Sequence, residues 1–209
     1  MPHLRKNVFI NCPFDIEYRP ILNSILFTLI YIGAMPILSE TISSSDIRII
    51  KIKKLIAEAD FSIHDISRCR IKKISELPRF NMPFELGLDI GSIYYGNKRQ
   101  KQKRILILEK DKYFYQKILS DISGQDIFNH NDKPIKVIEI IRDWFSVLNK
   151  KKYDSLEKIW NYYNDFNDSL IISLQKEGCK KNRILKLPVT EFIGYAGKYI
   201  KEIMKTKVI

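Results

Sequence analysis

Short apolar runs alternate with longer amphipathic segments over the first 149 residues of this chain. The runs are typical of buried strands, and the segments repeat their apolar residues at the spacing of a core-facing helix. The expected strands lie at residues 8–10, 35–38, 61–64 and 104–108 and within 121–128, and the expected helices at 22–30, 49–58, 83–95 and 134–148. Strands that alternate with helices form a parallel sheet. We therefore expect an α/β fold with a doubly wound, mostly parallel sheet.

The pattern changes after residue 149. A helical stripe begins at Leu156, another helix is expected at residues 189–204, and no strand signal lies between them. The sequence thus predicts an α/β domain at residues 1–149 and a helical C-terminal extension at residues 150–209. This extension either completes the core of the domain or mediates self-association.

The chain carries a formal net charge of +12 at pH 7. Such a charge favours contact with polyanions or phosphorylated metabolites, but it also serves solubility alone. No base-reading motif accompanies it, so binding to nucleic acid is an option without motif support.

Three cysteines, Cys12, Cys69 and Cys179, are widely spaced and form no CxxC pair. Their odd number and spacing predict a reducing, cytoplasmic location and no metal site. The N-terminus lacks the apolar region of a secretory signal. The apolar run at residues 21–38 is interrupted by Gly33 and Pro36, so we expect no membrane span.

The most informative segment is the start of the expected helix at residues 83–95. It opens with Asn81 and Pro83, followed by a single carboxylate, Glu85. If Asn81 or Met82 caps the helix, Glu85 lies in a solvent-facing first turn, where the helix dipole favours its ionised form. An α/β sheet would place this turn at the crevice above the strand ends, where small ligands bind. An anion there suits catalysis at a sugar carbon that develops positive charge, although first-turn glutamates are also common for structural reasons.

Other polar residues are expected at the same edge of the sheet. The loops after the first and third strands meet there, which groups Asn11, Phe14 and Asp15 with His64 and Asp65. Asp65 is a candidate for holding a ribose hydroxyl. His64 is either an acid–base group or a buried structural residue, and Phe14 either stacks on a base or fills the core.

The basic loop at residues 66–80 supplies Arg68 and Arg79, which either bind phosphate or lie in solvent. Phe80 either stacks on a base or fills the core. Asp89, one turn after Glu85, is either a second carboxylate of the site or a solvated residue. No GxSxG, Walker A or GxGxxG motif is present, which argues against serine hydrolase, P-loop and dinucleotide-fingerprint chemistry.

Three features together resemble the TIR-like and nucleoside 2-deoxyribosyltransferase-like superfamily. They are residues 8–11 with the following Pro-Phe-Asp loop, the strand that ends in Asp65, and the element Asn81-x-x-Phe84-Glu85-Leu86-Gly87. The resemblance covers about residues 6–148 and implies a flavodoxin-like or TIR-like sheet. It also implies that Glu85 is the nucleophile or stabilises an oxocarbenium ion, that Asn81 orients Glu85 or the sugar, and that Asp65 contacts the ribose.

The acidic residue that deoxyribosyltransferases place shortly before the nucleophile has no counterpart, because Arg79 and Phe80 occupy that region. The resemblance therefore implies an N-glycosidase that hydrolyses NAD or a related nucleotide and needs no cofactor. Bacterial members of the superfamily cleave such nucleotides, often as antiphage effectors, so the resemblance implies that role as well. A nucleoside 2-deoxyribosyltransferase and a nucleotide sensor without turnover are the alternatives. The implied partners are the nucleotide and either a second copy of the chain or a protein of a defence system.

Overall fold

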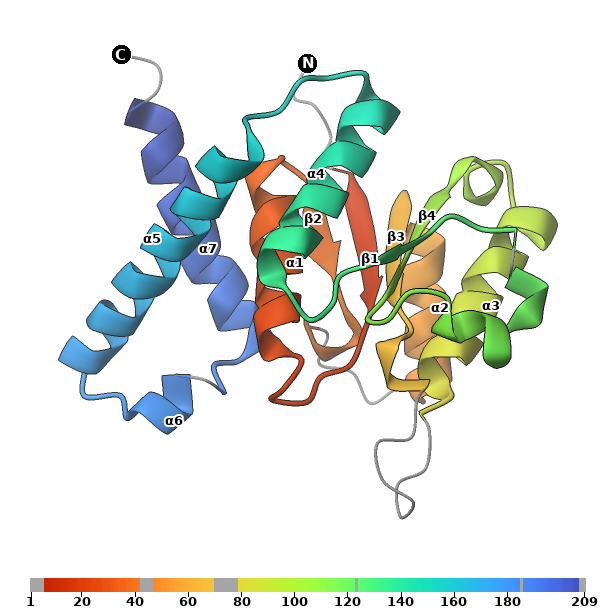
Figure 1. Ribbon diagram of the computed structural model, residues 1–209, viewed down its shortest axis with the longest axis horizontal. Coiled ribbons are helices and arrows are strands. Elements are labelled where there is room, and N and C mark those ends of the chain that lie inside the picture. Colours follow the sequence, from red (N-terminus) through yellow and green to blue (C-terminus); the bar gives the residue numbers. More distant parts are fainter. Residues whose placement is uncertain (1–5, 42–46, 70–78, 123, 185, 207–209) are drawn as a thin grey trace. The chain divides into compact units, whose positions relative to one another are not determined.

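The computed structural model describes residues 6–41, 47–69, 79–122, 124–184 and 186–206 (Figure 1). The chain divides into two compact units. The first unit contains Met1–Pro13 and Met35–Asp132, and the second contains Phe14–Ala34 and Lys133–Ile209. The predicted division into residues 1–149 and 150–209 stays a prediction.

The first unit is built on a five-stranded sheet. Its strands are β1 (Asn7–Asn11), β2 (Met35–Ile37), β3 (Phe61–Asp65), β4 (Arg104–Glu109) and β5 (Ile127–Asn129). They pair in the order β2-β1-β3-β4-β5, and every pair is parallel. This is the strand order of flavodoxin-like folds. The predicted α/β fold with a parallel sheet is therefore confirmed.

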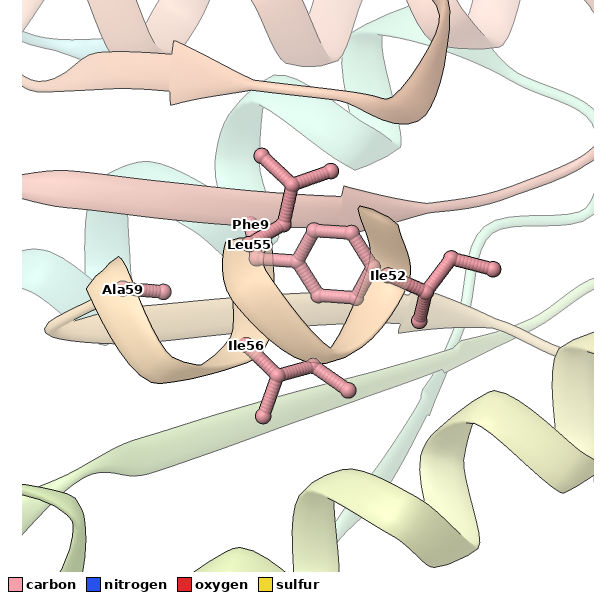
Figure 2. Close-up of a cluster of buried hydrophobic side chains, with 5 residues drawn as sticks. All are labelled: Phe9, Ile52, Leu55, Ile56 and Ala59. Carbon is pink, nitrogen blue, oxygen red and sulfur yellow. The ribbon is translucent and has the colours of Figure 1, made fainter. Parts of the chain in front are cut away.

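Two helices, α2 (Arg48–Glu58) and α3 (Asn81–Tyr95), connect the strands of this sheet and pack against it. In Figure 2, Phe9 of β1 packs among Ile52, Leu55, Ile56 and Ala59 of the α2 segment. These positions repeat at helical spacing, which is why the sequence pattern revealed the helix. Because side chains alternate along a strand, Phe9 and Asn11 of β1 point to the face that α2 covers.

A second apolar cluster lies toward β4. Leu86 of α3 packs with Ile107 of β4, Ile66, Cys69 and Tyr115. Tyr115 belongs to the segment between β4 and β5, which contains the short 3-10 helices η4 (Phe114–Lys117) and η5 (Ser120–Ile122). The fifth strand is therefore shorter than residues 121–128, because the first part of that range forms η5.

The second unit is helical. It consists of α1 (Arg19–Tyr31), α4 (Pro134–Asn149), α5 (Leu156–Lys176), α6 (Lys181–Ile184) and α7 (Val189–Thr206). Aromatic rings fill its centre: Phe27 of α1 stacks on Phe166 of α5, and Phe192 of α7 meets Phe166 edge-on. The predicted helices after residue 150 are thus confirmed. Among the helices of the described residues, none is long and apolar enough to cross a membrane.

Ile56 and Ile50 provide a matched test of the packing of α2. Ile56 is buried in the cluster of Figure 2, whereas Ile50 is exposed on the same helix. We expect Ile56→Ala to lower the free energy of unfolding by about 2–5 kcal/mol, because it removes apolar contacts and leaves a cavity. Ile50→Ala should change it by less than about 1 kcal/mol. Urea denaturation of both variants measures the difference, and equal effects would contradict this packing.

Candidate functional site

Glu85 lines a small cavity formed by the N-terminal halves of α2 and α3. The cavity has a volume of about 170 Å³. Its lining residues are Arg48, Ile49, Ile52, Asn81, Phe84 and Glu85. Asn81, Phe84 and Glu85 share one face of α3 because they are three and four residues apart. Helices that follow parallel strands begin at the carboxyl edge of the sheet, so the cavity lies where α/β folds bind ligands.

The carboxylate of Glu85 is buried and faces the guanidinium group of Arg48. Its side chain is 6% exposed, and Oε1 lies 3.5 Å from a terminal guanidinium nitrogen of Arg48, whose side chain is 57% exposed. Burial raises the pKa of Glu85 above its ordinary value, and the charge of Arg48 opposes part of that rise. The ionised form therefore depends on Arg48.

The expectation that Glu85 occupies a solvent-facing first turn is wrong. The helix begins at Asn81 with Phe80 as its N-cap residue, and no acidic residue lies in its first turn. Glu85 is thus one turn further in and packs against α2. Burial, rather than the helix end, dominates the pKa of its carboxyl group.

A buried hydrogen-bond network begins beside Glu85, at Asn11 of β1. Asn11 Nδ2 donates to the backbone oxygen of Met82, at 2.9 Å, and to Nδ1 of His64, at 3.0 Å. An amide nitrogen carries two hydrogens and can only donate, so Nδ1 of His64 is an acceptor. Nε2 of His64 therefore carries the proton and donates to Oδ2 of Asp89, at 2.9 Å.

Lys103 completes this network from the residue before β4. Its ammonium donates to Oδ1 of Asp89, at 2.7 Å, and to the backbone oxygen of Ile56. The side chains of His64, Asp89 and Lys103 are fully buried. Burial alone would raise the pKa of Asp89, but the hydrogen bonds from His64 and Lys103 and the positive charge of Lys103 lower it to about 2. Asp89 is therefore a buried anion, not a solvated residue.

Asp65 lies in a different cluster. Adjacent residues of a strand point to opposite faces, so Asp65 and His64 diverge. Asp65 Oδ2 accepts from His130 Nε2 at 3.0 Å, and its Oδ1 accepts from the backbone amide of Ser67 at 2.8 Å. Asp65 does not line the cavity of Glu85. Its role in ribose binding stays a prediction.

Ser67, His130 and Asp65 do not form a catalytic triad. The backbone amide of Asp132 donates to His130 Nδ1 at 3.0 Å, so Nε2 carries the proton. That same Nε2 lies 3.0 Å from Asp65 and 3.2 Å from Ser67 Oγ. In a triad the histidine is the base, and the nucleophile and the orienting acid contact different nitrogens of its ring.

The remaining predicted residues lie outside the cavity lining. Arg68 is half-buried and Arg79 is exposed, and the Arg79 amide donates to the backbone oxygen of Arg68 at 3.2 Å. Residues 70–78 of the basic loop are outside the described part of the chain. Phe14 and Asp15 belong to the second unit, where Asp15 Oδ1 accepts from the amide of Tyr18. Their contributions to ligand binding stay predictions.

Sequence reasoning missed Arg48 and Lys103. Arg48 lies just before the expected helix at residues 49–58, and no pattern distinguishes it from other surface cations. Lys103 ends a run rich in lysine and arginine before β4, and only its pairing with Asp89 marks it as buried. Phe80 is exposed, so it does not fill the core.

No protein-family model, curated protein or solved structure matches the chain. The resemblance to the TIR-like and deoxyribosyltransferase-like superfamily therefore stays a prediction. Within the described ranges, no group of three or more His, Cys, Asp or Glu side chains is arranged to hold a metal ion.

The buried anion of Asp89 makes stability depend on acid pH. Its pKa is lowered from 3.8 in the unfolded chain to about 2. Its ionised form therefore stabilises the fold by about 2 kcal/mol above pH 4, and this contribution is lost as the pH falls through about 2. Urea denaturation at a series of pH values, for wild type and Asp89→Asn, should show a stability difference that shrinks below pH 4. Asp168→Asn, an exposed change on α5, is the control. If the difference in unfolding free energy between wild type and Asp89→Asn does not vary with pH, the proposed ion pairing of Asp89 is contradicted.

Proposed function

We propose that this protein is an N-glycosidase that hydrolyses NAD or a related nucleotide at Glu85. The observation that carries the proposal is the buried carboxylate of Glu85 in the lining of a cavity at the carboxyl edge of the sheet. The element from Asn81 to Gly87, which resembles the catalytic element of the TIR-like superfamily, supplies three of the six lining residues. The same resemblance suggests a role as an antiphage effector.

The environment of Glu85 suits a reaction that creates positive charge. A carboxylate that burial has stripped of most of its water interacts strongly with a nearby cation. Arg48 opposes the effect of burial on the pKa of Glu85 and so favours the anion. Because Arg48 is largely exposed, its charge is screened and does not cancel that of Glu85.

Asn81 and Phe84 would contact the substrate. The amide of Asn81 offers both a donor and an acceptor for a ribose hydroxyl. The ring of Phe84 is 58% exposed and forms part of the cavity wall, so it can stack on a flat heterocycle. Phe80, also exposed, lies one helical turn before Phe84.

The size of the cavity limits what enters it. Its volume of about 170 Å³ is below the range of about 300–1,000 Å³ that is usual for small-molecule sites. It would hold one ring of a nucleotide, with the phosphates outside. A phosphate just outside the cavity could form an ion pair with the exposed guanidinium group of Arg48.

With NAD as substrate, the bond between C1′ of the ribose and the nicotinamide nitrogen breaks. Its electron pair moves to that nitrogen, which loses its positive charge, so no general acid is needed. The cationic C1′ is stabilised or trapped by a carboxylate oxygen of Glu85. Water then forms the new bond to C1′ and releases a proton. Among the described residues, the cavity lining offers one carboxylate, which is sufficient for this leaving group.

The buried network would fix the geometry of this reaction. The hydrogen bond from Asn11 to the Met82 carbonyl holds the first turn of α3, and the ion pair of Asp89 holds the next turn after Glu85. Glu85 lies between these two attachments. Fixed placement of a charged group avoids reorganisation when the transition state forms.

Glu85→Gln is the direct test. It keeps the size of the side chain but removes the charge that would stabilise C1′, so we expect the release of free base to fall at least about 100-fold. Unfolding free energy should change by about 1 kcal/mol or less, because the paired Arg48 is exposed and can be hydrated. Chromatography of NAD, other nucleotides and deoxynucleosides after incubation with each protein measures the products.

The matched control is Glu58→Gln, an exposed change on α2 that should leave activity unchanged. Activity retained by Glu85→Gln would overturn the assignment of Glu85. Base exchange with an added free base, without net hydrolysis, would identify a deoxyribosyltransferase instead. Saturable nucleotide binding without any product would identify a sensor.

Arg48→Met tests the electrostatic role of Arg48. The active form of Glu85 is ionised, so activity should fall as the pH drops through the raised pKa of Glu85. Removal of Arg48 takes away a charge that lowers this pKa, and the acid limb of the pH–rate profile should move to higher pH. A limb that stays in place, or moves to lower pH, would show that Arg48 does not act on Glu85.

A further inference from the structure

Glu109, the last residue of β4, is a buried carboxylate with one unsatisfied oxygen. The residue is 3% exposed. Its carboxylate accepts backbone hydrogen bonds from Phe114 and Tyr115, but Oε2 has no partner among the described residues. A buried acceptor without a donor is uncommon in folded proteins, so it points to a group that binds there.

Glu109 also lines a cavity of about 240 Å³. The other lining residues are Lys112, Tyr113, Tyr115, Gln125, Asp126, Ile127, Phe128 and Asn129. Three of them are aromatic, and the walls come from the segment after β4 and from β5 with the residues before it. None of these residues lines the cavity of Glu85, so the two sites are separate in their composition.

The charged groups that act on Glu109 are the acids Asp111 and Asp65, although the chain as a whole is strongly basic. Burial, together with the charges of Asp111 and Asp65, raises the pKa of Glu109 to about 7 despite its two backbone hydrogen bonds. The same effect appears at Cys69, where burial and the charges of Asp65 and Glu109 raise the pKa of the thiol to about 12. The acids around Glu109 would therefore favour the binding of a positive charge.

Lys112 lines the same cavity but does not contact this oxygen. Its ammonium lies 4.8 Å from the centre of the Tyr113 ring, and Oε2 of Glu109 has no partner among the described residues. Tyr113 itself has a φ of 65°, a left-handed conformation that is unusual for a large side chain. Such conformations gather at ligand sites, where the surroundings maintain them. This backbone places an aromatic ring, which attracts cations, in the wall of the cavity.

We propose that this cavity binds a small organic cation, such as an amidinium, a guanidinium or an alkylammonium group. A cationic N–H donor would satisfy Oε2 of Glu109 and neutralise the surrounding acids, while the rings of Tyr113, Tyr115 and Phe128 would contact its apolar part. A metal ion fits poorly, because the described residues provide no cluster of three ligating side chains.

Benzamidine and benzamide form a matched pair of probes. They have nearly the same shape, but only benzamidine is charged. Isothermal titration of the full-length wild-type protein should show saturable binding of benzamidine at least tenfold tighter than that of benzamide. Equal affinity would overturn the proposal in favour of a neutral ligand, and no binding of benzamidine at millimolar concentration would overturn it as well. This comparison needs no variant and so does not depend on how a substitution affects folding.

Glu109→Gln should weaken benzamidine binding at least tenfold. Glu202→Gln, an exposed change on α7, is the matched control and should have no effect. Lys112→Gln should strengthen binding, because it removes a competing positive charge from the cavity wall. Benzamidine affinity that is unchanged in Glu109→Gln would place the cation elsewhere and overturn the assignment.

The pH dependence provides a further readout. The titratable groups described on the elements around Glu109 are Asp65, Cys69, Lys110, Asp111, Lys112, Tyr113, Tyr115, Asp126 and His130. With a pKa of about 7, Glu109 gains its negative charge between pH 6 and pH 8. Benzamidine should therefore bind about tenfold tighter at pH 8 than at pH 6. Glu109→Gln should abolish this pH dependence of the benzamidine affinity. If the pH dependence persists in the variant, a group other than Glu109 causes it, and the assignment of the cation to Glu109 is overturned. Failure of these tests would not affect the proposed reaction at Glu85, because the two cavities share no described residue.

Discussion

The buried ion pair between Asp89 and Lys103 is the contact on which the candidate site depends. Two charges removed from water are stable only where each hydrogen-bonding group has a partner. His64 satisfies the second oxygen of Asp89, and the Ile56 carbonyl accepts from Lys103. This network joins β3, α3, the end of α2 and the start of β4. Glu85 lies one helical turn before Asp89, so its position follows from the placement of the pair.

The fold could be predicted because the apolar residues of its strands and helices follow the patterns typical of each. Ile52 and Ile56 repeat at helical spacing, and residues 8–10 form an uninterrupted apolar run. The fifth strand is harder to predict, since only Ile127–Asn129 pairs with β4 and the 3-10 helix η5 occupies Ser120–Ile122. Three residues are too few to establish a period, and their pairing depends on a neighbouring strand.

The site could be predicted only in part. Asn81 and Glu85 lie four residues apart, and a helix places them together whatever surrounds it. The burial of Glu85 depends on α2, and the burial of Lys103 depends on Asp89, fourteen residues earlier in the chain. Local sequence does not encode such tertiary partners. For the same reason, Lys103 looked like the exposed cations around it, and His64 and Asp65 looked like neighbours in one site although they join separate clusters.

Ile56 belongs to both systems that hold the first unit together. Its side chain packs in the apolar cluster against β1, while its carbonyl oxygen accepts from Lys103. Because both sets of contacts include Ile56, a movement of this residue that breaks the apolar contacts also breaks the hydrogen bond to Lys103. The second half of α2, the middle of α3 and β3 would therefore open as one cooperative unit, and their backbone amides would exchange hydrogen with solvent at a common, slow rate.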